Sequence, residues 1–243
     1  YNLVVFLFKI YIIIKNYKEE FVLLNKVDLL GKVKGEVNYL EEKELSLFNF
    51  EFNYTYQGEV EQDTITVVSY GNLGERIRDN LEEGQGLIIS GRLRKRTEDN
   101  KVSLIINKYL TVENIEGRVY NEVALEGYLG QDPRLNVTES GTDVANVSLA
   151  VNENTKEEHT NWFNIVYFND SAKNHNQYLS AGALISVTGQ LQLNKWQDDA
   201  GEDRIDVRVI GNRTTYIRTG NGEKPDEETT NNNTEQEDLD VPF

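Results

Sequence analysis

The chain of 243 residues contains no cysteine and only two histidines, His159 and His175. Without cysteine, disulfide bonds, thiolate nucleophiles and cysteine-bound metals are excluded. The histidines do not stand at the spacing of paired metal ligands, and we expect both to be solvated loop side chains. The sequence also lacks a glycine-rich phosphate loop, a Gly-x-Ser-x-Gly motif and a His-Glu-x-x-His motif. These absences predict a protein that is not an enzyme and that holds no metal or cofactor.

Positive charge is scarce as well. The chain has 25 lysines and arginines against 41 acids, which gives a net charge of −16. Almost half of that excess comes from residues 219–243, where eight acids stand against one lysine. Because neutralisation of phosphates dominates the affinity of proteins for nucleic acids, a nucleic-acid hypothesis requires local basic patches in the rest of the chain.

Long apolar runs are also missing, with one short candidate near the N-terminus. Residues 3–14 are apolar except for Lys9, so the run is too short and too interrupted to span a bilayer. It also lacks the basic-then-apolar order and the small-residue cleavage site of a secretory signal. We therefore treat residues 1–20 as an N-terminal extension without diagnostic value, and we expect no membrane partner.

The C-terminal segment, residues 219–243, has almost no large apolar residues. Such a segment does not bury enough surface to offset its ordering entropy, which predicts disorder. It nevertheless ends on the ring of Phe243 beside a free carboxylate, with two aspartates shortly upstream. This arrangement is typical of a peptide that docks its ring in a pocket while basic residues receive its charges. The predicted partner-binding residues are Asp238, Asp240, Val241, Pro242 and Phe243.

The region between the two ends contains an internal repeat. Residues 25–31 reappear as residues 121–127 after 96 positions, and Tyr70 and Phe168 are separated by 98 positions. A period of this length is too long for a solenoid and indicates two tandem copies of a small domain. The expected domains are residues 21–116 and residues 119–218, joined near Gly117.

Each copy has the pattern of five strands and one short helix. Alternating or continuous apolar residues with many β-branched side chains mark the strands. In the second copy the strands are expected at 122–127, 145–151, 162–168, 184–193 and 205–209; the helices are expected at 171–179 and, in the first copy, at 76–81. A helix between the third and fourth of five strands is typical of a small Greek-key barrel of the oligonucleotide-binding (OB) type. We therefore predict an all-β protein with two tandem OB-fold barrels. A generic β-barrel or sandwich is the alternative, which periodicity alone does not reject.

Three aromatic residues of the second copy are candidates for contact with bases. Trp162 begins a strand, Phe168 follows in the same strand, and Trp196 precedes a hairpin turn. Aromatic faces stack on any base, a contact that contributes about 1–3 kcal/mol per base without reading sequence. Lys195 and Arg204 stand on the two sides of that hairpin and are candidates for the backbone phosphates. For any single ring, the residues alone favour a place in the barrel core over contact with a base.

Several motifs of the second copy occur together with the acidic tip. They are Asn121-x-Val123-x-Leu125-x-Gly127-x-Leu129-Gly130-x-Asp132-Pro133, Gly141-Thr142-x-Val144-Ala145-Asn146-Val147-Ser148-Leu149-Ala150, Thr160-x-Trp162-Phe163-Asn164-Ile165-Val166-x-Phe168, Gly189-x-Leu191 with Lys195-Trp196, and Asp238-Leu239-Asp240-Val241-Pro242-Phe243. On these motifs, residues 121–217 resemble the bacterial single-stranded DNA-binding protein family. Barrel motifs, spacing and tip in combination make the resemblance specific.

The resemblance implies that Trp162, Phe168 and Trp196 occupy the family's base-stacking positions. A fourth position, commonly aromatic in the family, falls near Thr155 here, so that platform is missing. The family often has a basic residue after the third-strand aromatic, where this chain has Asn169-Asp170. These departures imply weaker contact with phosphates in the second copy.

The first copy resembles a diverged member of the same family. Tyr70 matches the position of Phe168 and is its expected stacking ring, whereas Thr64 and Glu98 stand where the second copy has its tryptophans. Cations crowd its fourth strand, and three of them alternate onto one face, a spacing suited to a phosphate chain. These cations are Arg92, Arg94, Lys95 and Arg96. A solvated charged hairpin is the alternative.

Five aromatic residues of the first copy share one face of a strand. Phe48, Phe50 and Phe52 are expected in the core. Tyr54 and Tyr56, nearer the end of the strand, are candidates for the binding groove.

The resemblance implies a protein that coats and protects single-stranded DNA in replication, recombination and repair, in the cytoplasm with the nucleoid. Its acidic tip is expected to recruit replication, recombination and repair proteins. Because family members usually present four barrels, a homodimer is expected, with a homotetramer less favoured. The rival hypotheses are an accessory nucleic-acid-binding protein of a phage, plasmid or organelle with weak or RNA-directed binding, and an interaction adaptor whose barrels have lost DNA binding. A nuclease is the weakest rival, since no metal or nucleophile constellation exists.

Overall fold

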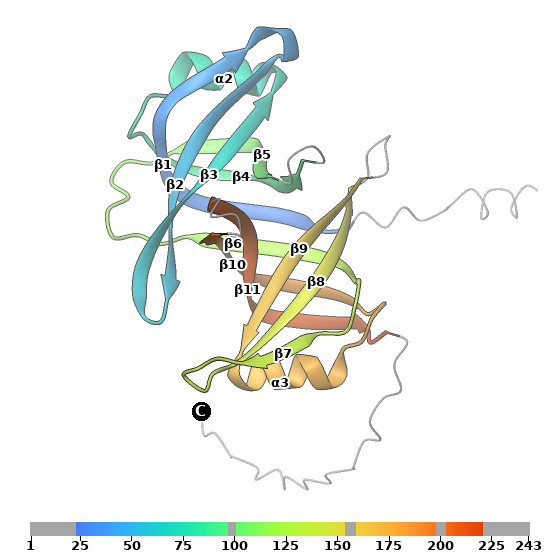
Figure 1. Ribbon diagram of the computed structural model, residues 1–243. Helices are drawn as coiled ribbons and strands as arrows, with labels where there is room; N and C mark the ends of the chain where they lie inside the picture. Colours follow the sequence, from blue (N-terminus) through green and yellow to red (C-terminus); the bar gives the residue numbers. More distant parts are fainter. Residues whose placement is uncertain (1–22, 97–100, 154–158, 198–202, 221–243) are drawn as a thin grey trace, which may run out of the picture.

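The computed structural model describes residues 23–96, 101–153, 159–197 and 203–220, which form two β-barrels in one chain (Figure 1). For residues 195–197, 203 and 204 it describes the backbone alone. The predicted fold class, two tandem OB-fold barrels, is confirmed. Within the described ranges, no helix is long and apolar enough to cross a membrane.

The first barrel contains five strands and one α-helix. Its elements are β1 (Asn25–Leu40), a 3-10 turn η1 (Glu41–Lys43), β2 (Leu45–Tyr56), β3 (Glu59–Tyr70), α2 (Gly71–Asn80), β4 (Gly86–Lys95) and β5 (Val102–Thr111). Antiparallel pairs join β1 to β2 and β4, β2 to β3, and β4 to β5. A parallel pair between β3 and β5 closes the barrel.

The second barrel repeats this plan with one extra strand. Its elements are β6 (Asn121–Leu129), β7 (Arg134–Val137), β8 (Asp143–Glu153), β9 (His159–Phe168), α3 (Asn169–Tyr178), β10 (Leu184–Gln197) and β11 (Asp203–Arg218). A parallel pair between β9 and β11 closes it. The short β7, which the sequence did not predict, pairs with β8 and is exposed at all four positions, so it has no alternation of buried residues to reveal it.

Both helices begin earlier than predicted. α2 starts at Gly71 instead of residue 76, and α3 starts at Asn169 instead of residue 171. These two residues have φ angles of 57° and 53°, in the left-handed region that glycine and asparagine tolerate. The chain therefore turns from strand into helix without a loop, and the apolar spacing used for the prediction begins only after the first turn.

Alternating side chains fill the interior of each barrel. In β6, Val123, Leu125 and Leu129 are buried, with more exposed residues between them. Burial of one such side chain contributes about 1.5–3 kcal/mol relative to exposure. The core also contains the first barrel's Phe48, Phe50 and Phe52, each at most 1% exposed, which confirms the prediction for these three rings.

The two barrels share equivalent hydrogen bonds at equivalent positions. The Asn25 amide donates to the Leu93 carbonyl at 2.8 Å and accepts from the Leu93 N–H at 3.0 Å. Asn121 does the same with Leu191, at 2.9 Å and 2.8 Å. Each asparagine stands in the first strand of its barrel, just past the point where the backbone pairing of that strand with the fourth strand ends. The internal repeat of the sequence is thus also a repeat of side-chain contacts.

An antiparallel pair between β1 and β6 joins the barrels into one continuous sheet. Val27 stands opposite Val123, its own equivalent in the repeat, and Asn25 stands opposite Leu125 as Leu29 stands opposite Asn121. The barrels are therefore related by a pseudo-twofold axis that passes through the valine pair.

Each barrel also extends a hairpin across the other (Figure 1). On the β8–β9 side, Asn161 Oδ1 accepts from the Lys95 N–H of the first barrel at 2.7 Å. On the β2–β3 side, Asp63 Oδ2 accepts from the Leu193 N–H of the second barrel at 2.8 Å. These acceptors are equivalent in the repeat, and so are the donors. The two hairpins thus make quasi-equivalent junctions.

Candidate nucleic-acid interface

Trp162 lies on the outer surface of the second barrel near the start of β9. It stands opposite Ala150 of β8, and 47% of the tryptophan is exposed. The six-membered ring of the indole lies against Gly130, where an added Cβ would collide with it. Trp162 is therefore an exposed flat platform seated against the backbone, and it is not part of the core.

A groove of about 480 Å³ runs beside this ring. Its lining combines the indole with Lys95 from the first barrel, Arg134 from β7 and the amides of Asn146 and Asn164, which lie 3.3 Å apart. Asp206 of β11 is the one acid among the described lining residues. A flat ring beside cations and neutral amides suits the stacking and phosphate contacts that proteins make with single strands.

The other candidates of the second barrel are placed less fully. Phe168 ends β9 directly before α3 and is half-buried. The backbone register sets Trp196 opposite Arg204 and Lys195 opposite Ile205 in the β10–β11 hairpin. The side chains of Lys195, Trp196 and Arg204 lie outside the described part, so their contribution to a groove stays a prediction.

The first barrel has a different set of residues at the equivalent surface. Thr64 stands opposite Glu51 in the strand pair that matches the tryptophan's, and Lys34 lies beside them on β1. By register, Lys34 of the first barrel corresponds to Gly130 of the second. Glu51 likewise corresponds to Ala150, and Thr64 corresponds to Trp162. Lysine thus fills the space in which the second barrel seats its indole.

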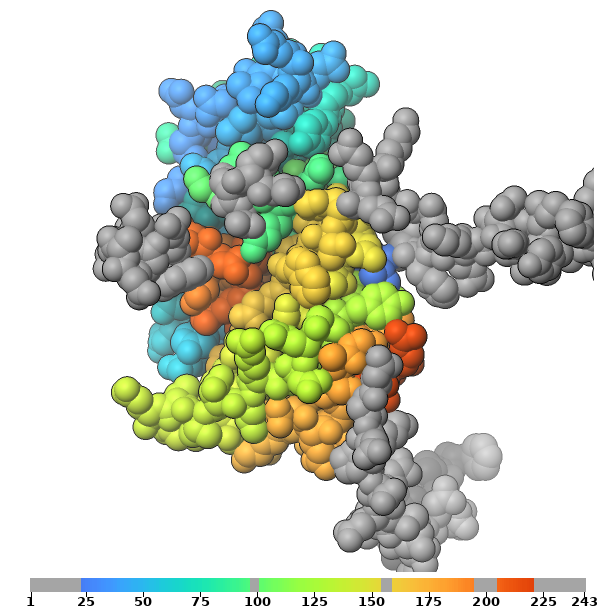
Figure 2. All heavy atoms as spheres, turned by 45° about the vertical axis from the view of Figure 1, so that its right-hand side comes forward, coloured from blue at the N-terminus to red at the C-terminus, as the bar shows by residue number. Residues whose placement is uncertain are grey.

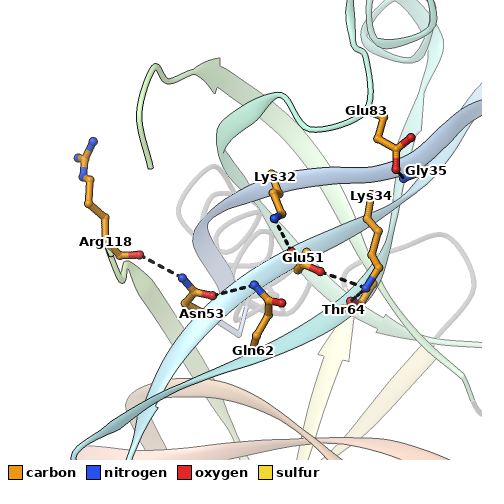
Figure 3. A network of polar contacts seen from close by, with 9 residues as sticks. All are labelled: Lys32, Lys34, Gly35, Glu51, Asn53, Gln62, Thr64, Glu83 and Arg118. Carbon is orange, nitrogen blue, oxygen red and sulfur yellow. Dashed lines mark hydrogen bonds and ion pairs between the residues drawn. The ribbon is translucent and has the colours of Figure 1, made fainter. Parts of the chain in front are cut away.

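These residues form a polar network, shown in Figure 3. Glu51 makes ion pairs with Lys32 at 2.9 Å and Lys34 at 3.0 Å, and the Lys34 ammonium also lies 3.4 Å from the Thr64 hydroxyl. The hydrogen bond from Lys32, with that from Lys34, lowers the pKa of Glu51 against the opposing effect of burial. The carboxylate is therefore ionised and satisfied at neutral pH. This surface of the first barrel is built for ion pairs and not for stacking.

Farther along the same surface, amide side chains link the barrel to the connection between the domains. Gln62 donates to Asn53 at 3.3 Å, and Asn53 donates to the carbonyl of Arg118 at 3.5 Å. The Arg118 guanidinium points away from this network (Figure 3).

Tyr70, the expected stacking ring of the first barrel, is 50% exposed at the end of β3. It directly precedes α2, as Phe168 directly precedes α3. The tyrosine lines a depression of about 230 Å³ together with Arg94, Arg96 and His159. Lys95 also lines it, so the structure brings this ring and three of the predicted cations to one place.

Arg92 and Arg94 share a face of β4, as predicted, but that face meets the second barrel. The Nε atom of each lies 3.7 Å from a carboxylate oxygen of Glu153, at the end of β8. The Glu153 side chain is only 4% exposed and accepts a hydrogen bond from Asn161 at 3.1 Å. These guanidiniums therefore have a protein carboxylate as partner, and their contact with phosphate stays a prediction.

The remaining sequence candidates lie away from the two depressions. Tyr54 packs against the barrel core, and the Tyr56 hydroxyl accepts a hydrogen bond from Gln57 at 3.3 Å. Neither tyrosine is among the residues that line the depressions beside Trp162 and Tyr70. The predicted partner-binding tip, Asp238, Asp240, Val241, Pro242 and Phe243, lies outside the described residues.

The prediction that both histidines are solvated loop side chains is wrong. His159 begins β9, and its Nε2 lies 3.0 Å from the Lys95 carbonyl oxygen. His175 is buried in α3, where its ring stacks on Tyr167 at 3.7 Å and its Nδ1–H donates to the Ser171 carbonyl at 2.6 Å. The sequence spacing gave no sign of these contacts, because the partners come from other strands or from the preceding turn.

Sequence reasoning also missed Arg134, Asn146, Lys34 and Glu51. The equivalence of positions 34 and 130 was visible in the repeat, since Lys34 and Gly130 follow the same motif by the same number of residues. The contacts of Arg134 and Asn146 with the groove were not visible, because they depend on the unpredicted β7 and on its partner strand.

Known proteins resemble this arrangement. Residues 120–217 match the model of the single-strand binding protein family. The wild-type single-stranded DNA binding protein from Thermus aquaticus is 24% identical, with a TM-score of 0.64, over 84% of this chain and 97% of that one. A deletion mutant of the same protein is 25% identical, with a TM-score of 0.63, over 85% of this chain and 98% of that one.

The fold and these matches define a protein with two OB-fold barrels in one chain. Its second barrel matches the single-strand binding protein family, and the chain as a whole resembles the Thermus aquaticus protein in fold.

Proposed function

We propose that this chain coats single-stranded DNA, stacking bases on exposed rings and holding phosphates with the cations beside them, largely without sequence preference. The observation that carries the proposal is Trp162, an exposed indole against Gly130 in a groove with Lys95 and Arg134. The similarity to the single-stranded DNA binding protein from Thermus aquaticus supports the same choice. The other proposed contacts are Phe168, Lys195, Trp196, Arg204, Tyr70, Arg92, Arg94, Arg96, Tyr54 and Tyr56.

A titration with labelled thymidine strands tests this function. We expect the full chain to bind a strand of roughly 30 nucleotides much more tightly than a duplex of the same length, because paired bases offer no free faces for stacking. Higher salt should weaken binding, by about 0.7 in the log–log slope for each phosphate contact. Equal affinity for strand and duplex would refute base stacking, and no binding to either would favour the interaction adaptor.

We further propose that the protein acts in replication, recombination and repair, in the cytoplasm with the nucleoid. Its acidic tip recruits partner proteins, with Phe243 as the anchor. Deletion of Pro242 and Phe243 removes no side-chain charge, so DNA affinity should stay almost unchanged. The same deletion should abolish capture of partner proteins in a pull-down, because the aromatic anchor is lost. A truncated chain that captures every partner of the full chain argues against this role.

We also propose that two chains form a homodimer, which presents four barrels. Light scattering on the purified protein should give about twice the chain mass of 27.9 kDa. A mass equal to a single chain at micromolar concentration would exclude the dimer.

A further inference from the structure

We propose that a DNA strand held by both barrels passes between them beside Lys95, and that this lysine positions the strand at the boundary. This proposal rests on the proposed function and adds the route of the strand. It implies that the step of the strand from one barrel to the other depends on the charge at this lysine.

Two depressions meet at this lysine. The groove along Trp162 and the depression beside Tyr70 both include Lys95 in their lining. Figure 2 shows this face, on which the green end of β4 and β5 meets the yellow strands β8 and β9 of the second barrel. An exposed ring thus stands on each side of the lysine, one from each barrel.

The crossing point is held by contacts between the barrels. The Lys95 N–H donates to Oδ1 of the fully buried Asn161 at 2.7 Å, and the Lys95 carbonyl lies 3.0 Å from Nε2 of His159. These two side chains bind the end of β4 much as a neighbouring strand would. These bonds hold the lysine backbone at the boundary, and its ammonium lies 3.8 Å from Asp206 of the second barrel.

The charge along this route favours a phosphate chain. Cations from both barrels line the two depressions, and Asp206 is the one acid among their described lining residues. The cations are Arg94, Lys95, Arg96 and Arg134. Local positive charge of this kind is what a chain with a net charge of −16 needs in order to bind DNA.

The described side chains of the second junction do not repeat this arrangement. By the repeat, Leu193 stands there in place of Lys95, Asp63 in place of Asn161, and Glu61 in place of His159. Among the described side chains at that boundary, a phosphate chain would meet the exposed carboxylate of Glu61, while Asp63 is buried. On the described side chains, charge therefore breaks the pseudo-twofold symmetry of the backbone and favours the Lys95 junction for a crossing strand.

The test compares short and long thymidine strands on the full chain. A strand of roughly 8 nucleotides fits one barrel, and one of roughly 20 spans two. The wild-type chain should bind the long strand at least about tenfold more tightly than the short one, because the added contacts include a second stacking ring. The Lys95→Glu variant places a carboxylate at the crossing. Its affinity for the long strand should therefore exceed that for the short strand by about twofold or less. The short strand should still quench tryptophan emission.

Two variants serve as matched controls. Lys173→Glu makes the same charge change on α3, at another exposed lysine that pairs with an acid, Asp143 at 3.0 Å. It should keep the full advantage of the long strand, and so should Lys95→Arg. A Lys95→Glu chain that retains the wild-type advantage overturns the proposal, because the strand then passes between the barrels without this lysine.

Tyr70→Ala tests the route without altering the junction. It should weaken binding of the long strand by about fivefold or more through the lost stack, and unchanged affinity would also overturn the proposal. Failure of the proposed function has a different signature. In that case neither strand quenches the tryptophan emission of the wild-type chain.

Discussion

Gly130 and Trp162 depend on each other, and the first barrel shows what replaces them. The indole lies flat only because position 130 has no side chain. In the first barrel the equivalent position is Lys34, and the ring is replaced by Thr64, to which the lysine ammonium approaches at 3.4 Å. Glycine at this position therefore accompanies a surface that can stack on bases, and lysine accompanies a surface of ion pairs.

Gly130→Ala should weaken DNA binding with little loss of stability. The new Cβ pushes the indole from its seat, which should cost part of the about 1–3 kcal/mol that one stacked base contributes. Because the ring is 47% exposed, it can move into solvent, and the melting temperature should change little. Fluorescence titration with a thymidine strand and a thermal melt measure the two effects.

A double-mutant cycle provides the control. In a Trp162→Ala chain, the further change Gly130→Ala should have no effect on affinity, because the ring it displaces is absent. Equal losses from Gly130→Ala in both backgrounds would show that the glycine acts on DNA binding by another route.

Strand β4 of the first barrel and strand β8 of the second are joined by a carboxylate. Glu153 is nearly buried and lies 3.7 Å from the Nε atoms of Arg92 and Arg94. Among the described side chains, loss of the cations would leave this carboxylate with the hydrogen bond from Asn161. The two arginines therefore contribute to the junction whether or not DNA is bound.

Replacing both Arg92 and Arg94 with Ala should lower the free energy of unfolding by about 1–3 kcal/mol, the cost of a buried polar group without its partner. Adding Glu153→Gln should restore most of that loss, because the unpaired charge is removed. Urea unfolding of the three chains measures the difference. If the arginines are a solvated face, the double substitution leaves the unfolding midpoint unchanged.

Helix α3 carries a titratable group in the core of the second barrel. Burial lowers the pKa of His175, and the hydrogen bond to the Ser171 carbonyl opposes this effect only in part. The unfolded chain keeps the ordinary histidine pKa of about 6.5. Below that pH the unfolded state binds a proton that the folded state does not, so stability should fall as the pH drops toward the lowered pKa.

Urea unfolding between about pH 7 and about pH 5, the range in which histidine titrates, checks this expectation. His175→Phe keeps a ring against Tyr167 and removes the titration. Its stability should therefore depend less on pH over this range than that of the wild type. Equal slopes would assign the pH dependence to other groups.

Most strands were predictable because their side chains alternate between core and solvent, as in β6. The helix starts were not, because Gly71 and Asn169 leave the strands through left-handed backbone angles that no apolar pattern reports. The strand β7 was hidden for a related reason, since all of its residues are exposed. Periodicity therefore reveals elements that border the core and misses those that do not.

At the scale of the whole molecule, a nearly symmetric backbone carries an asymmetric surface. The Val27–Val123 pair on the pseudo-twofold axis and the paired asparagine contacts of the two barrels follow the repeat. The charges do not follow the repeat. Lys95 at one junction corresponds to Leu193 at the other, and Asn161 corresponds to Asp63. The repeat thus predicted the architecture, whereas only the family resemblance implied an exposed position for Trp162. The partners of Arg92 and Lys95 come from the other barrel, so only the tertiary structure reveals them.

The central claim is that exposed tryptophan stacks on the bases of single-stranded DNA. The chain has two tryptophans, so its emission reports directly on Trp162 and Trp196. Addition of a saturating thymidine strand should quench this emission strongly, and Trp162→Ala should lose a large part of the quenching together with about 1–3 kcal/mol of binding free energy. Binding with unchanged emission, or full affinity in the Trp162→Ala chain with its fold intact, would contradict the claim.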